Sequence, residues 1–351
     1  MVHLKKKILF ITGSNNQTTQ MHQIAEQLPE FDCWFSQIFT DSPILKYLQN
    51  HTSLAKNTIM AGQFRERSEE YLRKNKLNLD YGGKKNHYDL VVYCSDLIIA
   101  NSLRKSKTIW VQEGMIDKST LLSTVVKNLG LPAYFSGNTA LNGSTDVCDI
   151  YCAASEGYKD LFTKGGTKAN KIFVTGIPNY DNCAQFLKND FPHRGYVMVA
   201  TSDMRETFRY EDRKAFIRQT VKIADGRPML FKLHPNEKFD RAEAEIKQYA
   251  PLDTLIYKAG NTDHMIANCS ELITQYSTVV YTGLALGKKV HSYFDLNELE
   301  SRQPVQNNGT SAQNIARICR AYIEFEGNSK NFLKQFEYKA QEVIQLEEAY
   351  A

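Results

Sequence analysis

The sequence predicts an α/β fold made of two domains, each built on a parallel sheet. Short, apolar, β-branched runs alternate with helical patterns along the chain, and polar or glycine-containing turns follow the runs. This arrangement is typical of parallel strands that helices cover on both faces. The alternation restarts after a turn-rich stretch at 184–194, and 351 residues are enough for two domains. We therefore expect two Rossmann-like domains that face each other across a cleft.

The first half of the chain supplies five candidate strands. They lie at 8–11, 89–93, 108–111, 150–154 and 171–176. A helical pattern near 18–28 follows the first of them. Charged and amide residues dominate from 42 to 85, which predicts one or two surface helices and then a loop at 81–85.

The second half repeats the pattern. Candidate strands lie at 196–200, 229–233, 255–257, 271–274 and 289–293, and candidate helices near 213–224, 241–249 and 277–286. We expect an N-terminal domain at 1–185 and a C-terminal domain at 186–330. A last segment at 331–351, with a helix around 330–348, is expected to pack back onto the N-terminal domain.

Charge and hydropathy exclude several classes of protein. Lys and Arg number 43 against 39 Asp and Glu, a net charge of +4, and no dense basic tract with interleaved aromatics occurs. Nucleic acid is therefore not the expected partner, whereas anionic small molecules such as nucleotides fit. No apolar stretch approaches the roughly 18 residues that span a bilayer. The apolar run after the basic N-terminus ends after 8–11, too short for a secretion signal.

The cysteines predict buried thiols in a reducing compartment. Their number, seven, is odd, and no C-x-x-C pair occurs. Cys148 and Cys152 lie four residues apart, but no second ligand pair accompanies them, so we expect no metal site.

Polar stretches follow the predicted strands, where open parallel sheets bind their ligands. The first stretch contains Gly13, Ser14 and Asn15, which we take as candidate substrate-binding residues. It is neither a G-x-G-x-x-G motif nor a P-loop, and an ordinary β–α turn explains it equally well.

The next stretch places a carboxylate at a strand end. Glu113 could act as a general base there, and Gly114 would let a substrate approach the backbone. Asp117 competes with Glu113 for the role, and a carboxylate that only interacts with a helix dipole is the alternative.

Two stretches of the second half offer phosphate ligands. Ser202 and Arg205 follow its first strand, and Lys232 and His234 lie at the end of its second. A hydroxyl, a helix start and an arginine suit a phosphate. A histidine fixed by the following proline could donate a proton to one. Capping and core packing are the competing explanations.

The last stretch follows the strand at 271–274. It consists of Gln275, Tyr276, Ser277 and Thr278. Hydroxyl groups at the start of the next helix could bind a phosphate together with the helix N-terminus, although an ordinary cap would look the same.

These motifs resemble those of the GT-B superfamily. Bacterial sialyl-, polysialyl- and Kdo-transferases pair an acidic-Gly motif with His-Pro and Ser-Ser/Thr, similar to Glu113-Gly114, His234-Pro235 and Ser277-Thr278 in that order. CDP-glycerol glycerophosphotransferases carry a similar His-Pro and helix start. Gln275, however, stands where they have Asp, which weighs against CDP-glycerol.

A second resemblance is to hydrolysing UDP-GlcNAc 2-epimerases. The stretches 174–179 and 199–206, and the pair His234-Pro235, are similar to theirs. The epimerases have ribose-binding carboxylates where this chain has Val279, Val280 and Tyr281, which weighs against epimerisation of a UDP-sugar.

The resemblance implies a metal-independent glycosyltransferase of bacterial polysaccharide biosynthesis, with a nucleotide-sugar as co-substrate and no cofactor. The acceptor would be a surface glycan or a lipid-linked precursor, and a CMP-activated acidic sugar is the favoured donor. Glu113 would deprotonate the acceptor, and His234 would bind or protonate the leaving phosphate. Ser277 and Thr278 would hold that phosphate, which Ser202 and Arg205 would support.

Two other functions stay open: a nucleotide-sugar epimerase or hydrolase, and a GT-B module that binds a glycan without turnover. We expect a cytoplasmic protein. Association with the inner face of the membrane also stays open, although the sequence shows no clear basic amphipathic helix that would support it.

Overall fold

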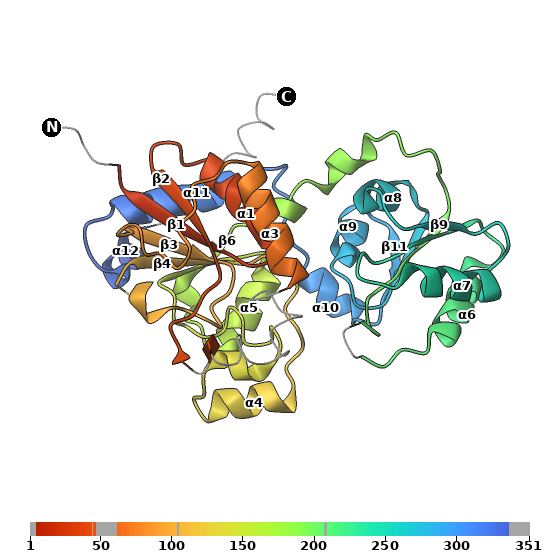
Figure 1. The fold of residues 1–351 in the computed structure, drawn as a ribbon, viewed down its shortest axis with the longest axis horizontal. Helices are drawn as coiled ribbons and strands as arrows, with labels where there is room; N and C mark the ends of the chain where they lie inside the picture. The colour runs from red at the N-terminus through yellow and green to blue at the C-terminus, as the bar shows by residue number, and fades with distance from the viewer. Residues whose placement is uncertain (1–4, 44, 47–61, 104, 207–208, 337–351) are drawn as a thin grey trace. The chain divides into compact units, whose positions relative to one another are not determined.

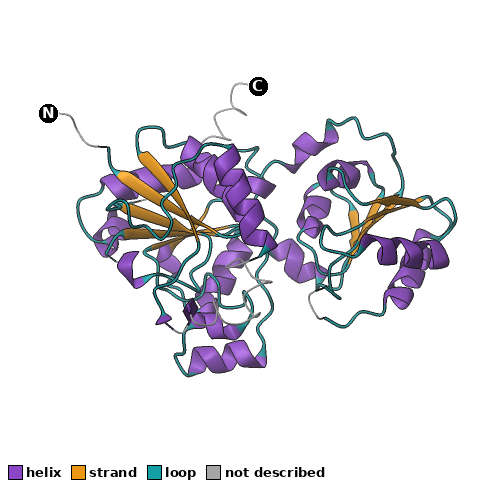
Figure 2. Cartoon of the chain, in the orientation of Figure 1, coloured by secondary structure: helices purple, strands orange, loops and turns teal. Residues whose placement is uncertain are grey.

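The computed structural model describes residues 5–43, 45–46, 62–103, 105–206 and 209–336. The chain divides into two compact units: unit 1 comprises 1–181 and 309–351, and unit 2 comprises 182–308. Each unit is a parallel sheet with helices between successive strands (Figures 1 and 2). The predicted α/β class is therefore confirmed.

Unit 1 is built on a six-stranded parallel sheet of order β2-β1-β3-β4-β5-β6. The strands are β1 (Lys7–Thr12), β2 (Asp32–Gln37), β3 (Leu90–Tyr93), β4 (Lys107–Val111), β5 (Ile150–Ala153) and β6 (Ile172–Val174). Five of them lie where the sequence predicts strands. β2 was missed because Asp32, Ser36 and Gln37 interrupt its apolar pattern.

The helices of unit 1 cover the sheet and its ends. They are α1 (Asn15–Glu26), α3 (Gln63–Lys74), α4 (Leu121–Asn128), α5 (Glu156–Gly165), α11 (Ser311–Glu324) and α12 (Ser329–Gln335). Short 3₁₀ turns η2 (Asn101–Leu103), η3 (Ala133–Ser136), η4 (Ala169–Lys171) and η5 (Pro178–Tyr180) complete the connections. The helix α3 and the glycines of 81–85 fit the surface helix and loop predicted in 42–85, of which 44 and 47–61 lie outside the described residues.

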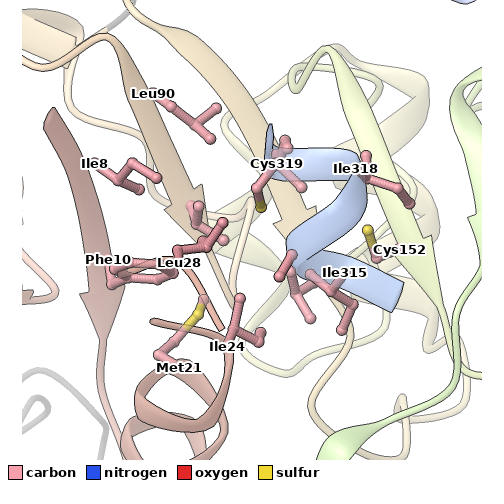
Figure 3. Packing of buried hydrophobic residues seen from close by; sticks show 14 of the residues in the cluster. Ile8, Phe10, Met21, Ile24, Leu28, Leu90, Cys152, Ile315, Ile318 and Cys319 are labelled. Carbon is pink, nitrogen blue, oxygen red and sulfur yellow. The ribbon is translucent and has the colours of Figure 1, made fainter. Parts of the chain in front are cut away.

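Side chains of β1 alternate between two cores. Ile8 and Phe10 face a cluster that includes Met21 and Ile24 of α1 (Figure 3). Successive strand residues point to opposite faces, so Leu9 lies on the other side, near Leu103. Burial of such a side chain stabilises the fold by roughly 1.5–3 kcal/mol.

The helix α11 belongs to unit 1, so the expectation of a single C-terminal domain at 186–330 is wrong for its last part. Ile315, Ile318 and Cys319 are buried in the same cluster as Ile8 and Phe10 (Figure 3). The ammonium of Lys107 donates to the carbonyls of Tyr322 and Phe325 at the end of α11, over 2.8 and 2.6 Å. The helix therefore completes the first core although it follows unit 2 in sequence.

Both boundaries of unit 2 differ from the expected ones. The first unit ends at Asp181, not at 185, and resumes at Gly309. The carboxylate of Asp181 accepts a hydrogen bond from the N–H of Ser311 over 2.6 Å, which joins the two chain segments of unit 1. Phe332 of α12 lies in the core of unit 1, and the predicted helix beyond 336 lies outside the described residues.

Unit 2 is built on a five-stranded parallel sheet of order β11-β10-β7-β8-β9. The strands are β7 (Val197–Ala200), β8 (Met229–Lys232), β9 (Leu255–Tyr257), β10 (Glu271–Thr274) and β11 (Lys289–His291). Each lies where the sequence predicts a strand, because the runs are short, apolar and bounded by turns.

The helices of unit 2 lie on both faces of its sheet. They are α6 (Arg213–Ala224), α7 (Phe239–Tyr249), α8 (Thr262–Asn268), α9 (Val279–Ala285) and α10 (Leu296–Ser301), preceded by the 3₁₀ turn η6 (Cys183–Leu187). Val197, Val199 and Phe231 pack against Phe216 and Ile217 of α6 on one face. The strands β7, β8 and β10 are buried along their whole length, as their continuous apolar runs predict, whereas the edge strands β9 and β11 are partly exposed.

Two further predictions concern single features. All seven cysteines are free thiols, and all but Cys33 are buried. In the part of the chain that the structure describes, no helix combines the length and apolar character that crossing a membrane requires.

Candidate functional site

The strand order of unit 2 creates a topological switch point between β7 and β10. From β7 the chain winds outward through β8 and β9, and then returns to the other side of β7 to form β10 and β11. In open parallel sheets, ligands bind beyond the carboxyl ends of the strands at such a point. The candidate residues Ser202 and Gln275–Thr278 follow these two strands directly.

Ser202 and Tyr276 join the two loops at the switch point. The hydroxyl of Ser202 donates to the carbonyl of Tyr276 over 3.2 Å and accepts from the N–H of Tyr276 over 3.3 Å. Ser202 is buried, whereas Tyr276 is 39% exposed. The serine therefore fixes the backbone from which the Tyr276 ring projects.

The ring of Tyr276 lies in an aromatic group. It meets Tyr293 and Phe294 edge-on, with centroid distances of 5.5 and 5.1 Å. Tyr293 is 45% exposed, and its N–H donates to the carbonyl of Gln275. Exposed aromatic faces of this kind can stack on a nucleobase. Sequence reasoning missed Tyr293 because it follows an edge strand outside the motifs.

Gln275 is buried, and its side-chain oxygen has no hydrogen-bond partner among the described residues. A buried acceptor without a partner costs about 1–3 kcal/mol, so it suits a donor supplied by a ligand. Ser277 and Thr278 lead into α9, and the hydroxyl of Ser277 lies 3.5 Å from the N–H of Val279. Because α9 has only seven residues, these side chains matter more than its dipole.

His234 follows β8, the strand beside β7, and its backbone is held firmly. Its N–H lies 3.0 Å from the hydroxyl of Thr201 and 2.8 Å from the carboxylate of Glu237. Its ring Nδ1 accepts from the N–H of Asn236 over 3.3 Å and lies 3.6 Å from the carboxylate of Asp203. With Nδ1 accepting, the neutral ring carries its proton on Nε2.

A buried ion pair stands behind His234. The carboxylate of Glu237 pairs with the guanidinium of Arg213 over 2.5 Å and accepts a short hydrogen bond from Thr201. Both charged side chains are almost fully buried. One carboxylate thus ties together the loops after β7 and β8. Sequence reasoning gave neither Glu237 nor Arg213 a role at the site, since a helix-starting arginine gives no local signal of such a pair.

Two predicted phosphate ligands are engaged elsewhere. The guanidinium of Arg205 forms a bidentate pair with Glu245, over 2.7 and 2.8 Å, and lies 3.1 Å from Glu211. The ammonium of Lys232 is buried and donates to the carbonyl of Leu233, and burial lowers its pKa. Both side chains hold unit 2 together, so the structure corrects their expected role at the phosphate.

In unit 1 the candidate base follows β4. The carboxylate of Glu113 accepts hydrogen bonds from the side-chain amides of Asn16, over 2.5 Å, and Gln17, over 3.4 Å. Burial raises the pKa of Glu113, and the two amides oppose this effect without cancelling it. A half-buried carboxylate with a raised pKa is a suitable general base.

Asn16 is itself oriented by a neighbouring amide. Its side-chain oxygen accepts from the amide of Asn179 over 2.9 Å, and Asn179 in turn accepts from Gln23 over 2.7 Å. Because Asn179 donates to the side-chain oxygen of Asn16, the NH₂ group of Asn16 is the group that faces Glu113 and donates to it. The sequence signal was available, because amide residues fill the first turn of α1.

Most of the other candidates in unit 1 support its loops. Gly13 is buried after β1, and Ser14 caps α1 in a capping box with Gln17. Asn15 is exposed at the start of the same helix. These contacts fit the ordinary β–α turn named as the alternative.

Gly114 and Asp117 also hold backbone in place. The carbonyl of Gly114 accepts from the buried amide of Gln112 over 2.8 Å. The carboxylate of Asp117 accepts from the N–H and the hydroxyl of Thr139, over 3.0 and 2.7 Å. Asp117 is thus committed to a loop contact, whereas the side chains of the described residues that donate to Glu113 are amides of α1.

A metal site has no support among the described residues. No group of three His, Cys, Asp or Glu side chains there could hold an ion. The expectation of metal-independent chemistry stays a prediction.

Comparison with known proteins finds solved structures of similar fold. No family model and no curated protein matches the chain. A solved structure from Listeria monocytogenes, described as a candidate UDP-N-acetylglucosamine 2-epimerase, matches with a TM-score of 0.54 and 14% identity over 92% of this chain and 98% of that one. S. aureus MnaA with UDP matches with 0.52 and 10% identity, over 91% and 97%.

A further match is the wall teichoic acid polymerase TagF, with a TM-score of 0.48 and 13% identity over 91% of this chain and 89% of that one. At the sequence identities of the Listeria and S. aureus structures, the likeness concerns the fold alone. Together with the two parallel sheets and their strand orders, it shows that this chain has the GT-B fold.

Proposed function

We propose that this chain is a metal-independent glycosyltransferase, which moves a sugar from a nucleotide donor to a glycan or to a lipid-linked acceptor. The observation that supports this most is the switch point of unit 2. There the bonded pair Ser202 and Tyr276, the unpartnered acceptor of Gln275 and the fixed ring of His234 follow three adjacent strands.

Each group at this edge has a chemical task in the proposal. The rings of Tyr276 and Tyr293 stack on the nucleobase, and Gln275 accepts a hydrogen bond from it. Nε2 of His234 donates to the phosphate, and the hydroxyls of Ser277 and Thr278 add donors. Neutral donors of this kind can stabilise a leaving phosphate without a metal.

Glu113 acts on the acceptor. The acceptor oxygen attacks the anomeric carbon of the donor, and its proton passes to the carboxylate of Glu113. The bond from the anomeric carbon to the phosphate oxygen breaks, and the nucleotide leaves with that electron pair. A raised pKa makes the carboxylate of Glu113 a stronger base than an ordinary glutamate.

The favoured donor is a CMP-activated acidic sugar, in line with the acidic-Gly, His-Pro and Ser-Thr motifs. A nucleotide-sugar 2-epimerase is the second candidate, because the Listeria and S. aureus structures carry that description or bind UDP. Val279 and Val280 occupy the first turn of α9, where that function calls for carboxylates.

A thermal-shift screen with CMP, CDP, UDP, GDP and dTDP tests the proposal. A ligand at about a hundredfold its dissociation constant adds about 2.7 kcal/mol of stability. We expect CMP or CDP to stabilise the protein, and His234→Ala to abolish the shift. His193→Ala is the control, since His193 packs on Phe191 and Tyr257 outside the three loops.

The other outcomes separate the candidates. A response to UDP alone, with UDP-sugar consumed in the absence of acceptor, would establish the epimerase or hydrolase. If none of the five nucleotides stabilises the protein, both the glycosyltransferase and the epimerase hypotheses are contradicted, and a GT-B module that binds a glycan without turnover remains.

A further inference from the structure

The helix α4 and the turn after it expose an unusual number of large apolar side chains. Leu121 is 89% exposed and Leu129 69% exposed. The full set, here called the α4 patch, is Leu121, Leu122, Val125, Leu129, Leu131 and Phe135. In Figure 1, α4 lies at the rim of unit 1, away from the strands of its sheet. Contiguous apolar patches of this kind mark interaction sites.

The burial pattern of α4 is the reverse of an ordinary surface helix. Its buried residues are Ser123 and Val126, and Ser123 forms a capping box with Thr120. The capping contacts, with hydrogen bonds of 2.8 and 3.1 Å between the two residues, define the first turn of the helix. Because Ser123 and Val126 face the unit, Leu121 and Leu122 lie on the exposed side of the helix.

The segment that carries the patch has a small excess of positive charge. Lys127 is exposed on α4, and Lys118 lies just before the helix. Asp117 is the single carboxylate between 115 and 136, and Thr139 holds it through two hydrogen bonds. Leucines together with lysines are the composition by which interfacial helices bind anionic lipid surfaces.

The patch borders a cavity of about 780 Å³ within unit 1. Leu131, Pro132 and Tyr134 line it from the segment after α4, and Ile98 and Ile99 line it from the connection between β3 and β4. Asp41, Asp96 and Asp149 also line the cavity, so its wall is mixed in polarity, and the apolar surface offered to lipid is the α4 patch itself.

We propose that α4 and η3 form a membrane-binding element, which inserts the α4 patch into the interface of an anionic bilayer. A second copy of the chain fits less well. An eight-residue helix is about 12 Å long, whereas a stable interface buries about 800 Å² on each partner. The inference goes beyond the proposed function, because this binding needs neither nucleotide nor turnover.

Co-sedimentation of the full chain with vesicles tests the proposal. The vesicles contain phosphatidylcholine alone or with about one third phosphatidylglycerol. We expect wild-type protein to sediment with the anionic vesicles. The triple variant Leu121→Ser, Leu122→Ser, Val125→Ser should lower the partition coefficient by at least about tenfold, the equivalent of ~1.4 kcal/mol. Lys127→Gln should lower it less and reduce its salt dependence.

A matched control comes from unit 2. Leu252 is 103% exposed and Tyr210 88% exposed, and the double variant Leu252→Ser, Tyr210→Ser should bind vesicles like wild type. Thermal midpoints of all variants verify folding, since the substituted side chains are exposed. Absence of wild-type binding at low salt, or unchanged binding of the triple variant, would overturn the proposal. So would a concentration-dependent dimer that the triple variant abolishes while vesicle binding is absent.

Nucleotide stabilisation of the triple variant separates this inference from the proposed function. It should equal that of wild type, because the α4 patch belongs to unit 1 and the nucleotide residues to unit 2. Loss of vesicle binding with normal nucleotide binding supports the membrane element alone. Vesicle binding without any nucleotide response would leave that element standing and contradict the enzyme.

Discussion

Ser202 and Tyr276 exchange two hydrogen bonds, of 3.2 and 3.3 Å, between the loops that follow β7 and β10. The two strands are neighbours in the sheet, paired from Glu271 with Val197 to Thr274 with Ala200. At the opposite, amino-terminal edge of the same strand pair, Ser270 donates to the carbonyl of Tyr196 over 3.1 Å. The same residue type thus joins both ends of one strand pair, and only the carboxyl end carries the candidate site.

This symmetry provides a matched test of the nucleotide site. Ser202→Ala should lower the free energy of unfolding by about 1–2 kcal/mol, since two hydrogen bonds are lost. It should also weaken nucleotide binding by about tenfold, because the backbone of Tyr276 is released. Ser270→Ala should reduce stability without changing nucleotide affinity. Calorimetric titration and denaturant unfolding measure the two effects, and equal affinities for both variants would contradict the site.

Glu113→Gln tests the proposed base. The variant should lower kcat by about 10²- to 10⁴-fold with little change in KM for the donor, because Gln keeps the shape and loses the proton acceptor. Asp117→Asn is the control and should leave kcat unchanged. The reverse result would transfer the role to Asp117, the competing carboxylate.

The pH profile of activity should depend on Asn16. The Glu113 carboxylate must be ionised to act, so activity should rise with pH through its raised pKa. The Asn16 amide lowers that pKa, and Asn16→Ala should therefore move the acid limb to higher pH. Gln23→Ala, which alters only the more distant partner of Asn179, should move it less. A limb that stays in place in Asn16→Ala would show that another group titrates.

Glu237→Gln should destabilise the protein by about 1–3 kcal/mol, because it removes one of the two buried carboxylates, Glu237 and Glu211, that pair with the guanidinium of Arg213. Glu243→Gln offers a contrast. Glu243 pairs with Lys247 and Lys258 at the surface, and its replacement should change stability by less than about 1 kcal/mol. Denaturant unfolding measures both variants, and similar losses would mean that the buried pair is not decisive.

Asp96 should make stability fall with rising pH. It is buried in unit 1, where it accepts from Gly143 and Thr145 over 2.8 and 2.5 Å, yet burial raises its pKa from 3.8 to about 6. The folded state thus holds the proton more tightly than the unfolded state. Its stabilising effect is complete below about pH 4 and is lost as pH rises through about 6, an effect of up to about 3 kcal/mol.

Asp96→Asn should remove this slope, because Asn does not titrate and can still accept from Gly143. Unfolding free energies of both proteins from pH 4 to 7 measure the difference. Parallel curves would show that Asp96 does not titrate in this range.

Gly143→Ala should cost about 1–3 kcal/mol from overpacking, with backbone strain in addition. Gly143 has a φ of +79°, and a Cβ there would lie 2.7 Å from the ring of Phe162 and 2.9 Å from Trp110. Gly195→Ala is the control for strain alone, since its φ is +74° and nothing lies within 4 Å of an added Cβ. The midpoint temperature of thermal unfolding should be clearly lower for Gly143→Ala than for Gly195→Ala. Equal midpoint temperatures would exclude a packing contribution at Gly143.

The sequence by itself determined the α/β class, ten of the strands and the loops in which Ser202, His234 and Tyr276 lie. These features are local: apolar runs bounded by turns define a strand wherever they occur, and a ligand-binding loop follows it directly. The mixed polar sequence of β2 has no such signal, because the strand is defined by its pairing with β1.

Only the tertiary structure decided which side chains meet. It bound Arg205 to Glu245 and Lys232 to backbone carbonyls, and it supplied Asn16 to Glu113 and Glu237 to His234. It also returned α11 to the core of unit 1 and turned the leucines of α4 outward. The physical reason is that partners, burial and the exposed face of a helix depend on contacts between residues far apart in sequence, which the strand order and the two cores establish.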